Sequence, residues 1–220
     1  MKKVLLTILA GMFMIGSAYA QPSFTVGIGF NKGVFAAEGR EENFDESGTL
    51  KSVTEEYGAF EDSYASIYVE VGNEVGSIGL AYQDDVATPT NVNETNADDG
   101  GSSTATSTVS ADFSGVITLY GLVNLPMNTY LKAGIVQGDI AISETQKSGN
   151  TYKDQDLEGY VLGFGYQHEA AEANIRVELL GHTYDDVETN NGVATTGNHN
   201  KVRISNMIGA NAQISVNRSF

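Results

Sequence analysis

The sequence predicts an all-β protein that forms an eight-stranded antiparallel up-and-down transmembrane β-barrel. Three observations support this fold class. Apolar and polar residues alternate along eight segments, short and long connections alternate between those segments, and an apolar leader opens the chain. A period of two is typical of strands with one apolar face. Short turns at one end and long loops at the other are typical of a barrel that crosses a membrane.

The first 20 residues have the layout of a secretory signal peptide. Two lysines precede an apolar run, 4–15, and small residues at Ala18 and Ala20 flank a predicted cleavage point. The apolar run is shorter than the roughly 20 residues that a membrane-spanning helix needs, which disfavours an N-terminal anchor. We therefore expect residues 1–20 to be removed and residues 21–220 to form one barrel domain.

Each of the eight segments places apolar side chains on one face. In the first, the even-numbered residues from Phe24 to Phe30 are apolar and the odd-numbered residues are small or polar. The fourth segment is apolar on both faces, so its register stays open. The expected strands cover residues 23–36, 63–72, 75–84, 111–124, 129–143, 157–167, 173–184 and 201–220.

The connections between the strands differ in length and in charge. Three are short turns, and four are long polar segments that hold most of the 28 acidic residues, against 12 basic residues in the chain. A net charge of −16 argues against nucleic acid and other polyanions as partners. The chain has no cysteine, so disulfides and zinc thiolates are excluded. The expected loops are centred on 38–48, 89–107, 146–155 and 189–200.

Alternation alone does not separate a membrane barrel from a soluble lipocalin-like carrier, because both have one apolar face. The composition of the other face is more informative. It is rich in small residues, which would leave a soluble surface poorly solvated but would fit a crowded lumen. These small residues are Gly27, Gly29, Ser66, Gly79, Ala81, Gly163, Gly165, Ser205, Gly209 and Ser215.

Four charged residues share the small-residue face and lie at similar depth, a few residues from the short turns. They are Glu70, Lys132, Arg176 and Glu178. An unpaired charge inside a barrel costs several kcal/mol, so two acids and two bases there should pair. We expect a lumen charge network; the alternative is that they are solvated surface charges of a soluble barrel.

Aromatic residues recur near the strand ends on the apolar face, as in the girdles that membrane barrels have at both interfaces. The expected girdle residues are Phe24, Tyr166 and Phe220 beside the short turns, with Phe113, Tyr160 and Tyr82 beside the loops.

The C-terminal residues resemble the signal by which bacterial outer-membrane barrels are handed to their assembly machinery. Phe220 is the terminal aromatic of that pattern, and Ile214 and Val216 supply apolar residues at alternate positions, whereas Arg218 departs from it. With its leader, eight strands and terminal Phe, the mature chain resembles small outer-membrane barrels of the OmpA transmembrane-domain, OmpX and opacity-protein type.

The resemblance implies a location in the outer membrane of a Gram-negative bacterium, in contact with its lipid and lipopolysaccharide. We also expect that the peptidoglycan-binding domain, which follows the barrel in OmpA-type proteins, is absent after Phe220. We expect a non-enzymatic contribution to envelope integrity or to surface interaction, made through four acidic extracellular loops whose partner the sequence does not identify. The alternative is a porin-like channel for small solutes, in which the lumen charges form a gate.

Candidate catalytic residues are few. Of the three histidines only His182 lies on the lumen face near the loops, and Ser205 is the one hydroxyl that could be its neighbour. The resemblance argues against known barrel enzymes, because the His-x-Ser motif of the lipid A deacylases and the first-loop His of the palmitoyl transferases are missing. The omptin proteases have more strands. We therefore expect a plain polar lumen, no catalytic site and no cofactor.

Two acidic pairs beside the second loop could bind Ca²⁺ or Mg²⁺ weakly. Their spacing does not match an EF-hand loop, so a solvated acidic loop is the favoured interpretation. The four residues are Asp84, Asp85, Asp98 and Asp99.

Overall fold

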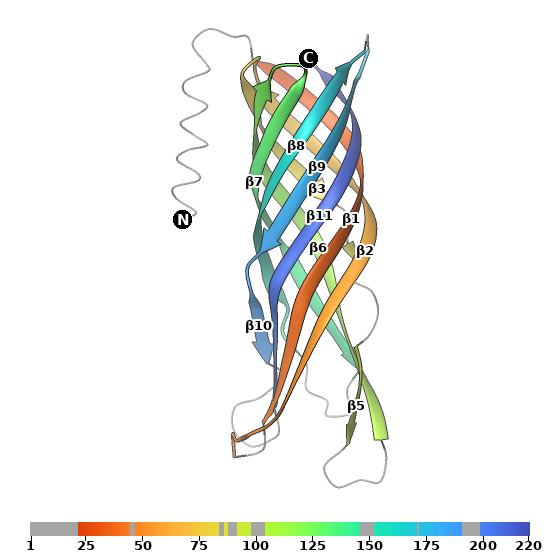
Figure 1. Ribbon diagram of the computed structural model, residues 1–220, viewed down its shortest axis with the longest axis vertical. Coiled ribbons are helices and arrows are strands. Elements are labelled where there is room, and N and C mark those ends of the chain that lie inside the picture. The colour runs from red at the N-terminus through yellow and green to blue at the C-terminus, as the bar shows by residue number, and fades with distance from the viewer. Residues whose placement is uncertain are drawn as a thin grey trace.

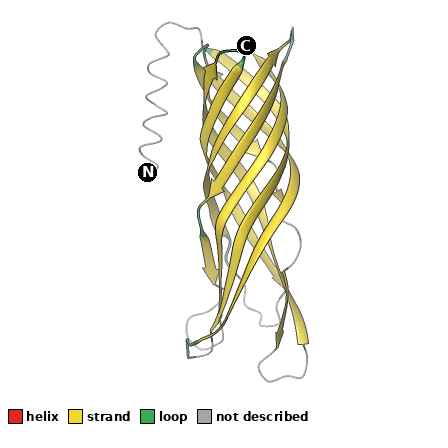
Figure 2. Cartoon of the chain, in the orientation of Figure 1, coloured by secondary structure: helices red, strands yellow, loops and turns green. Residues whose placement is uncertain are grey.

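The computed structural model describes residues 22–44, 47–83, 86–87, 92–97, 104–145, 152–170, 172–190 and 199–220. In this part of the chain, eight long antiparallel strands form a closed barrel (Figures 1 and 2). The sheet closes because β1 (Ser23–Phe44) pairs with both β2 (Leu50–Gly72) and β11 (His199–Ser219). The remaining long strands are β3 (Gly76–Gln83), β6 (Thr104–Leu125), β7 (Thr129–Thr145), β8 (Gln155–Glu169) and β9 (Asn174–Tyr184).

Three short strands extend the sheet outside the closed ring. β4 (Val86–Ala87) and β5 (Val92–Ala97) pair with β6, and β10 (Val187–Asn190) pairs with β11. Among the described residues, no helix has the length and hydropathy required to cross a bilayer.

The eight predicted strands and their up-and-down order are confirmed. The connections β2–β3, β6–β7 and β8–β9 are short and lie at the end where the chain terminates (Figure 1). The strand ends that the four long connections join lie at the opposite end, which we call the loop end. At the short-turn end, Phe24 and Phe220 exchange two backbone hydrogen bonds of 3.1 and 2.8 Å, so the last residue completes the ring.

The prediction of a loop at residues 38–48 is wrong, because β1 continues to Phe44. β1 and β2 stay paired as far as Phe44 opposite Leu50, and β1 stays paired with β11 as far as Phe44 opposite His199, so the sheet itself continues beyond the barrel at the loop end (Figure 1). We call the β1–β2 part of this extension the β1–β2 ribbon. Polar residues fit both faces of such a ribbon because water reaches both. The lack of an apolar face was therefore not evidence against a strand.

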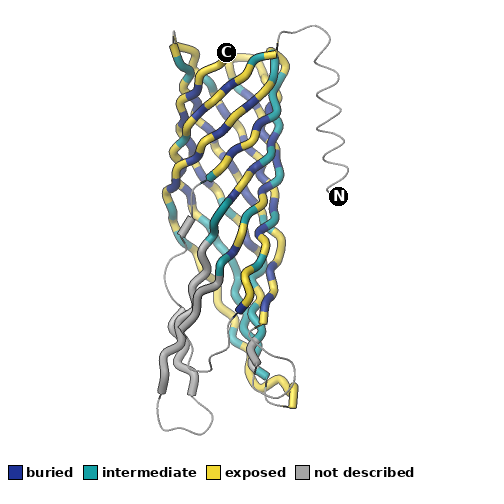
Figure 3. The backbone as a smooth tube through the Cα atoms, turned by 180° about the vertical axis from the view of Figure 1, so that it is seen from behind, coloured by how far each residue is buried: buried dark blue, intermediate teal, exposed yellow. Residues whose placement is uncertain are grey.

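The apolar face points outward and the small, polar face points into the lumen, as predicted. Ile28, Leu162 and Leu179 are 64, 68 and 64% exposed, whereas the lumen-facing Glu70 is 3% exposed. Buried and exposed positions alternate along the strands of the barrel wall (Figure 3). This orientation is opposite to that of a soluble carrier, which buries its apolar face.

Two β-bulges near the loop end reverse which side chains face the lumen, so the faces predicted there are wrong. Gly115 has φ of +60° and the β6–β7 register shifts between Ser114 and Ile117. An extra residue turns every following side chain to the other face. Phe113 therefore packs against the buried interior, and its prediction as an outward girdle residue is wrong.

A second bulge lies in β11 at Asn206, which has φ of +54°. The β1–β11 register shifts there, between Ala36 and Glu38. As a result Ile204, and not Ser205, packs against the buried interior. The prediction that Ser205 faces the lumen is therefore wrong.

Candidate functional site

The candidate site is the barrel interior, which has a polar half at the short-turn end and an apolar half at the loop end. In the polar half, Arg176 donates two hydrogen bonds to Glu70, with Nη1–Oε1 at 2.6 Å and Nη2–Oε2 at 2.9 Å. Lys132 Nζ lies 3.1 Å from Glu178 Oε2. All four residues are at most 8% exposed. The structure thus brings them together as two buried ion pairs.

Buried tyrosines complete the coordination of both carboxylates. The hydroxyl of Tyr120 donates to Glu70 Oε1 at 2.9 Å, and that of Tyr130 donates to Glu178 Oε1 at 2.9 Å. Lys132 Nζ also lies 4.2 Å from the centroid of the Tyr120 ring. Each carboxylate therefore accepts hydrogen bonds from a cation and from a phenol. A buried charge requires hydrogen-bond partners of this kind.

Aromatic rings also enclose the guanidinium of Arg176. Its Cζ lies 5.6 Å from the ring centroid of Tyr68 and 5.5 Å from that of Tyr130. The hydroxyl of Tyr68 on β2 is 3.1 Å from the hydroxyl of Ser215 on β11, and the contact passes over β1, which lies between these two strands. We call the seven residues Glu70, Lys132, Arg176, Glu178, Tyr68, Tyr120 and Tyr130 the tyrosine–carboxylate network.

Three glycines make room for the three tyrosines. Each tyrosine lies opposite a lumen-facing glycine on a neighbouring strand, and its ring covers that glycine. A Cβ atom added to any of these glycines would lie 2.2 to 2.4 Å from a ring atom, which is too close. The pairs are Gly27 with Tyr68, Gly79 with Tyr120, and Gly165 with Tyr130.

The sequence predicts the four charges and the small glycines of the lumen, but alternation along single strands does not reveal the part played by the tyrosines. A usable signal was present, because a large aromatic residue on a lumen face needs a small residue opposite it on the next strand. Finding the pairs requires the strand register, however, and the register of the strand that holds Tyr120 had stayed open.

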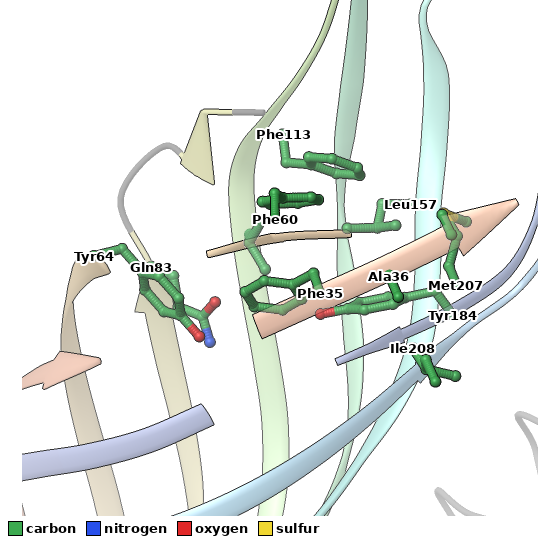
Figure 4. A pocket seen from close by; sticks show the side chains of 12 residues that line it. Phe35, Ala36, Phe60, Tyr64, Gln83, Phe113, Leu157, Tyr184, Met207 and Ile208 are labelled. Carbon is green, nitrogen blue, oxygen red and sulfur yellow. The ribbon is translucent and has the colours of Figure 1, made fainter. Parts of the chain in front are cut away.

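Above the network, the interior becomes apolar. Val116, Val136, Ile140, Leu157 and Val161 belong to one buried cluster toward the loop end. A pocket opens beside this cluster, and Figure 4 shows its side chains. The empty volume of the pocket, including space open to solvent, is about 500 Å³.

His182 lies between the two halves in a chain of buried amides. Asn31 Nδ2 donates to the backbone oxygen of Tyr64, and Asn211 Nδ2 donates to Asn31 Oδ1. Asn211 Oδ1 is then the acceptor for His182 Nε2, 2.6 Å away. His182 thus carries a proton on Nε2 and is held by an amide, which gives it a packing and orienting role.

The catalytic pair considered in the sequence is not assembled. His182 lies opposite Gly209, whereas Ser205 lies four residues further along β11, opposite Glu38. Within the described residues, no cluster of three or more His, Asp or Glu side chains could hold a metal ion. The four aspartates considered for cation binding, Asp84, Asp85, Asp98 and Asp99, lie outside the described residues.

The residues of the predicted assembly signal lie on the outer face of the last strand. Ile214, Val216 and Phe220 are 55, 47 and 72% exposed. The guanidinium Cζ of Arg218, which departs from the pattern, lies 5.4 Å from the ring centroid of Phe220. These residues thus form one side of the strand that closes the barrel.

Exposed ion pairs link neighbouring segments at the loop end. Arg40 Nη1 donates to Glu55 Oε1 at 2.9 Å across the β1–β2 ribbon. Arg203 Nη2 donates to Asp186 Oδ2 at 2.6 Å, and this hydrogen bond holds the pKa of Asp186 below its usual value. Such exposed pairs contribute little to stability because water screens them.

No protein-family model and no curated protein sequence matches this chain. Solved structures do match. The chain is similar over 92% of its length to 97% of the outer membrane protein OprG from Pseudomonas aeruginosa, with a TM-score of 0.57 and 12% identity. The matches to the outer membrane protein AlkL and to the outer membrane protease OmpT from Escherichia coli have lower TM-scores.

For AlkL the TM-score is 0.46, with 10% identity over 93% of this chain and 92% of AlkL. For OmpT it is 0.41, with 9% identity over 89% of this chain and 97% of OmpT.

The OprG match shows a shared fold, that of outer-membrane β-barrels. The belt of exposed Ile, Leu, Val and Phe side chains around the wall is a surface that lipid has to cover. The chain is thus an outer-membrane β-barrel.

We expect Glu70→Gln to lower the free energy of unfolding by about 3 to 5 kcal/mol, because Arg176 stays buried without its charge partner. The double variant Glu70→Gln/Arg176→Met should lose less than the sum of the single losses. Urea unfolding in lipid vesicles measures both. As a control, Glu61→Gln removes the exposed pair with Lys32 and should cost about 0.5 kcal/mol or less. Equal losses for Glu70→Gln and Glu61→Gln would contradict the network.

We expect Gly165→Ala to lower the free energy of unfolding by about 1 to 3 kcal/mol. The new methyl group displaces the ring of Tyr130 and breaks its hydrogen bond to Glu178. The matched control is Gly181→Ala, whose added Cβ has 3.8 Å to its nearest neighbour and should leave stability unchanged. The same vesicle assay applies, and indistinguishable midpoints would show that the ring does not need the glycine.

Proposed function

We propose that this outer-membrane barrel is closed to solutes and acts without catalysis at its loop end, contributing to envelope integrity or to contact with another surface. One observation carries the proposal: the tyrosine–carboxylate network fills the lumen with the side chains of residues that are at most 8% exposed. An eight-stranded barrel has an interior just wide enough for side chains to fill. Function then belongs to the ends and not to a pore.

The short turns and both ends of the barrel chain lie on one side, and we place that side in the periplasm. Outer-membrane barrels have short periplasmic turns and longer extracellular connections. The loop end then faces the cell exterior, with the β1–β2 ribbon projecting from it. Lipid and lipopolysaccharide cover the apolar belt, and the assembly machinery binds the strand that ends at Phe220.

The β1–β2 ribbon supports a surface role because it is acidic and ordered by strand pairing. It carries Glu41, Glu42, Glu55 and Glu56, and Arg40 is bound to two of these, Glu42 and Glu55. A negative surface attracts cations and repels polyanions. The partner of such a surface is therefore cationic, or reaches it through bound cations.

A porin-like channel is the competing function, because the same charges could form a gate. Their geometry disfavours it. Opening the lumen would require breaking the two-bond contact between Arg176 and Glu70 and the contact between Lys132 and Glu178, and moving three tyrosine rings off their glycines. Breaking one buried pair alone costs several kcal/mol.

Conductance across a planar bilayer tests the proposal. The refolded protein, with insertion verified by its heat-dependent migration in dodecyl sulfate, should give no discrete current steps. Replacing the lumen residues Tyr68, Tyr120 and Tyr130 together by Ala should produce steps, because it removes the rings that fill the lumen.

The matched control replaces three outward-facing tyrosines, Tyr82, Tyr160 and Tyr166, by Ala and should stay silent. Reproducible steps from the unmodified protein would overturn the closed barrel and favour the porin-like channel.

A further inference from the structure

The pocket at the loop end has an unusual lining. Five aromatic side chains surround it, those of Phe35, Phe60, Tyr64, Phe113 and Tyr184, and the lining includes no Lys or Arg. Figure 4 shows Phe35, Phe60 and Phe113 directed into the same space. The rings of Phe35 and Phe60 are stacked, with centroids 5.4 Å apart and planes 26° from parallel. Each of these two rings therefore covers one face of the other, and the lining as a whole is rich in aromatic carbon.

Aromatic faces carry partial negative charge and attract cations, most strongly where water is excluded. Groups of such faces are the usual binding sites of quaternary and other organic ammonium ions. Met207, with a polarizable sulfur, adds to the lining. The lining therefore suits a cation that carries its own apolar surface.

A carboxylate lies between two lining residues of this pocket along the chain. Asp62 lies between Phe60 and Tyr64 on β2, and strand alternation places the three on the same face. Asp62 Oδ1 accepts the backbone N–H of Ser63 at 2.7 Å. Asp62 Oδ2 is buried and has no hydrogen-bond partner among the described residues. A buried carboxylate oxygen without a partner is costly, and a bound cation would offset that cost.

The wider charge distribution favours the same ligand. The chain carries a net charge of −16, which raises the local concentration of cations. The nearest buried cations of the lumen, Lys132 and Arg176, are neutralised by their own carboxylates.

We propose that this pocket binds a small organic ammonium ion, with the aromatic rings around its alkyl groups and Asp62 as its counter-charge. The proposal concerns the loop end only and is independent of whether the lumen conducts. It assigns a ligand class to a surface that faces the cell exterior in the proposed topology.

Two ligands of nearly equal shape test the proposal. Choline carries a quaternary nitrogen, and 3,3-dimethylbutan-1-ol has carbon in its place and no charge. Binding is measured by NMR titration of the refolded protein in lipid nanodiscs, with empty nanodiscs subtracted. Choline should bind at least about tenfold more tightly than the alcohol, because only the cation gains from the rings and the carboxylate.

Variants of the protein locate the site. Asp62→Asn should weaken choline binding by about fivefold or more while leaving the alcohol unaffected. Phe60→Leu should weaken choline binding as well and provides a second test if Asp62→Asn does not fold. The matched control is Glu61→Gln, which removes an outward-facing carboxylate next to Asp62. It should leave both affinities within about twofold, since the exposed charge is screened.

Several results would overturn the proposal. Equal affinities for choline and the alcohol would mean that the pocket is merely apolar, and no binding of either would mean that it is not a ligand site. Equal losses in Asp62→Asn and Glu61→Gln would mean that choline responds to overall charge and not to this pocket.

Discussion

The structure depends on one constraint: charges inside a narrow, lipid-surrounded barrel must be fully paired. Glu70 and Glu178 are satisfied by Arg176, Lys132 and two phenol hydroxyls, all within hydrogen-bond distance. The phenols reach the carboxylates only because each ring crosses a glycine on the neighbouring strand. The glycines of the wall therefore determine where the tyrosines lie, the tyrosines fix the carboxylates, and the carboxylates neutralise the two bases.

The constraint also divides the interior into two functional halves. Polar groups concentrate at the short-turn end, where they pair with one another, and the loop end is left with aliphatic and aromatic side chains. A bulge in β6 and another in β11 turn Phe113 and Ile204 inward at that end, which enlarges the apolar interior. The filled polar half of the lumen and the apolar half that holds the pocket are thus consequences of the same strand register.

Much of the fold could be predicted from the sequence, because a period of two and the lengths of the connections are local properties. The placement of Ile28 and Glu70 on opposite faces followed from alternation, and the small residues on the face of Glu70 identified that face as the lumen. The positions of Phe113 and Ser205 did not, because one extra residue at Gly115 or Asn206 reverses the faces without altering composition. The tyrosine–glycine pairs were likewise missed, since they depend on the register between strands. The ribbon beyond the barrel was missed because both of its faces are polar.

Hydrogen exchange at the tyrosine hydroxyls tests the central claim most directly. In the refolded barrel, NMR at neutral pH should detect slowly exchanging hydroxyl protons for Tyr120 and Tyr130, close in space to the side chains of Glu70 and Glu178. An outward-facing tyrosine such as Tyr166 should exchange too fast to be seen. Rapid exchange at Tyr120 and Tyr130 would show that water fills the lumen, and the account of a closed, fully paired interior would be wrong.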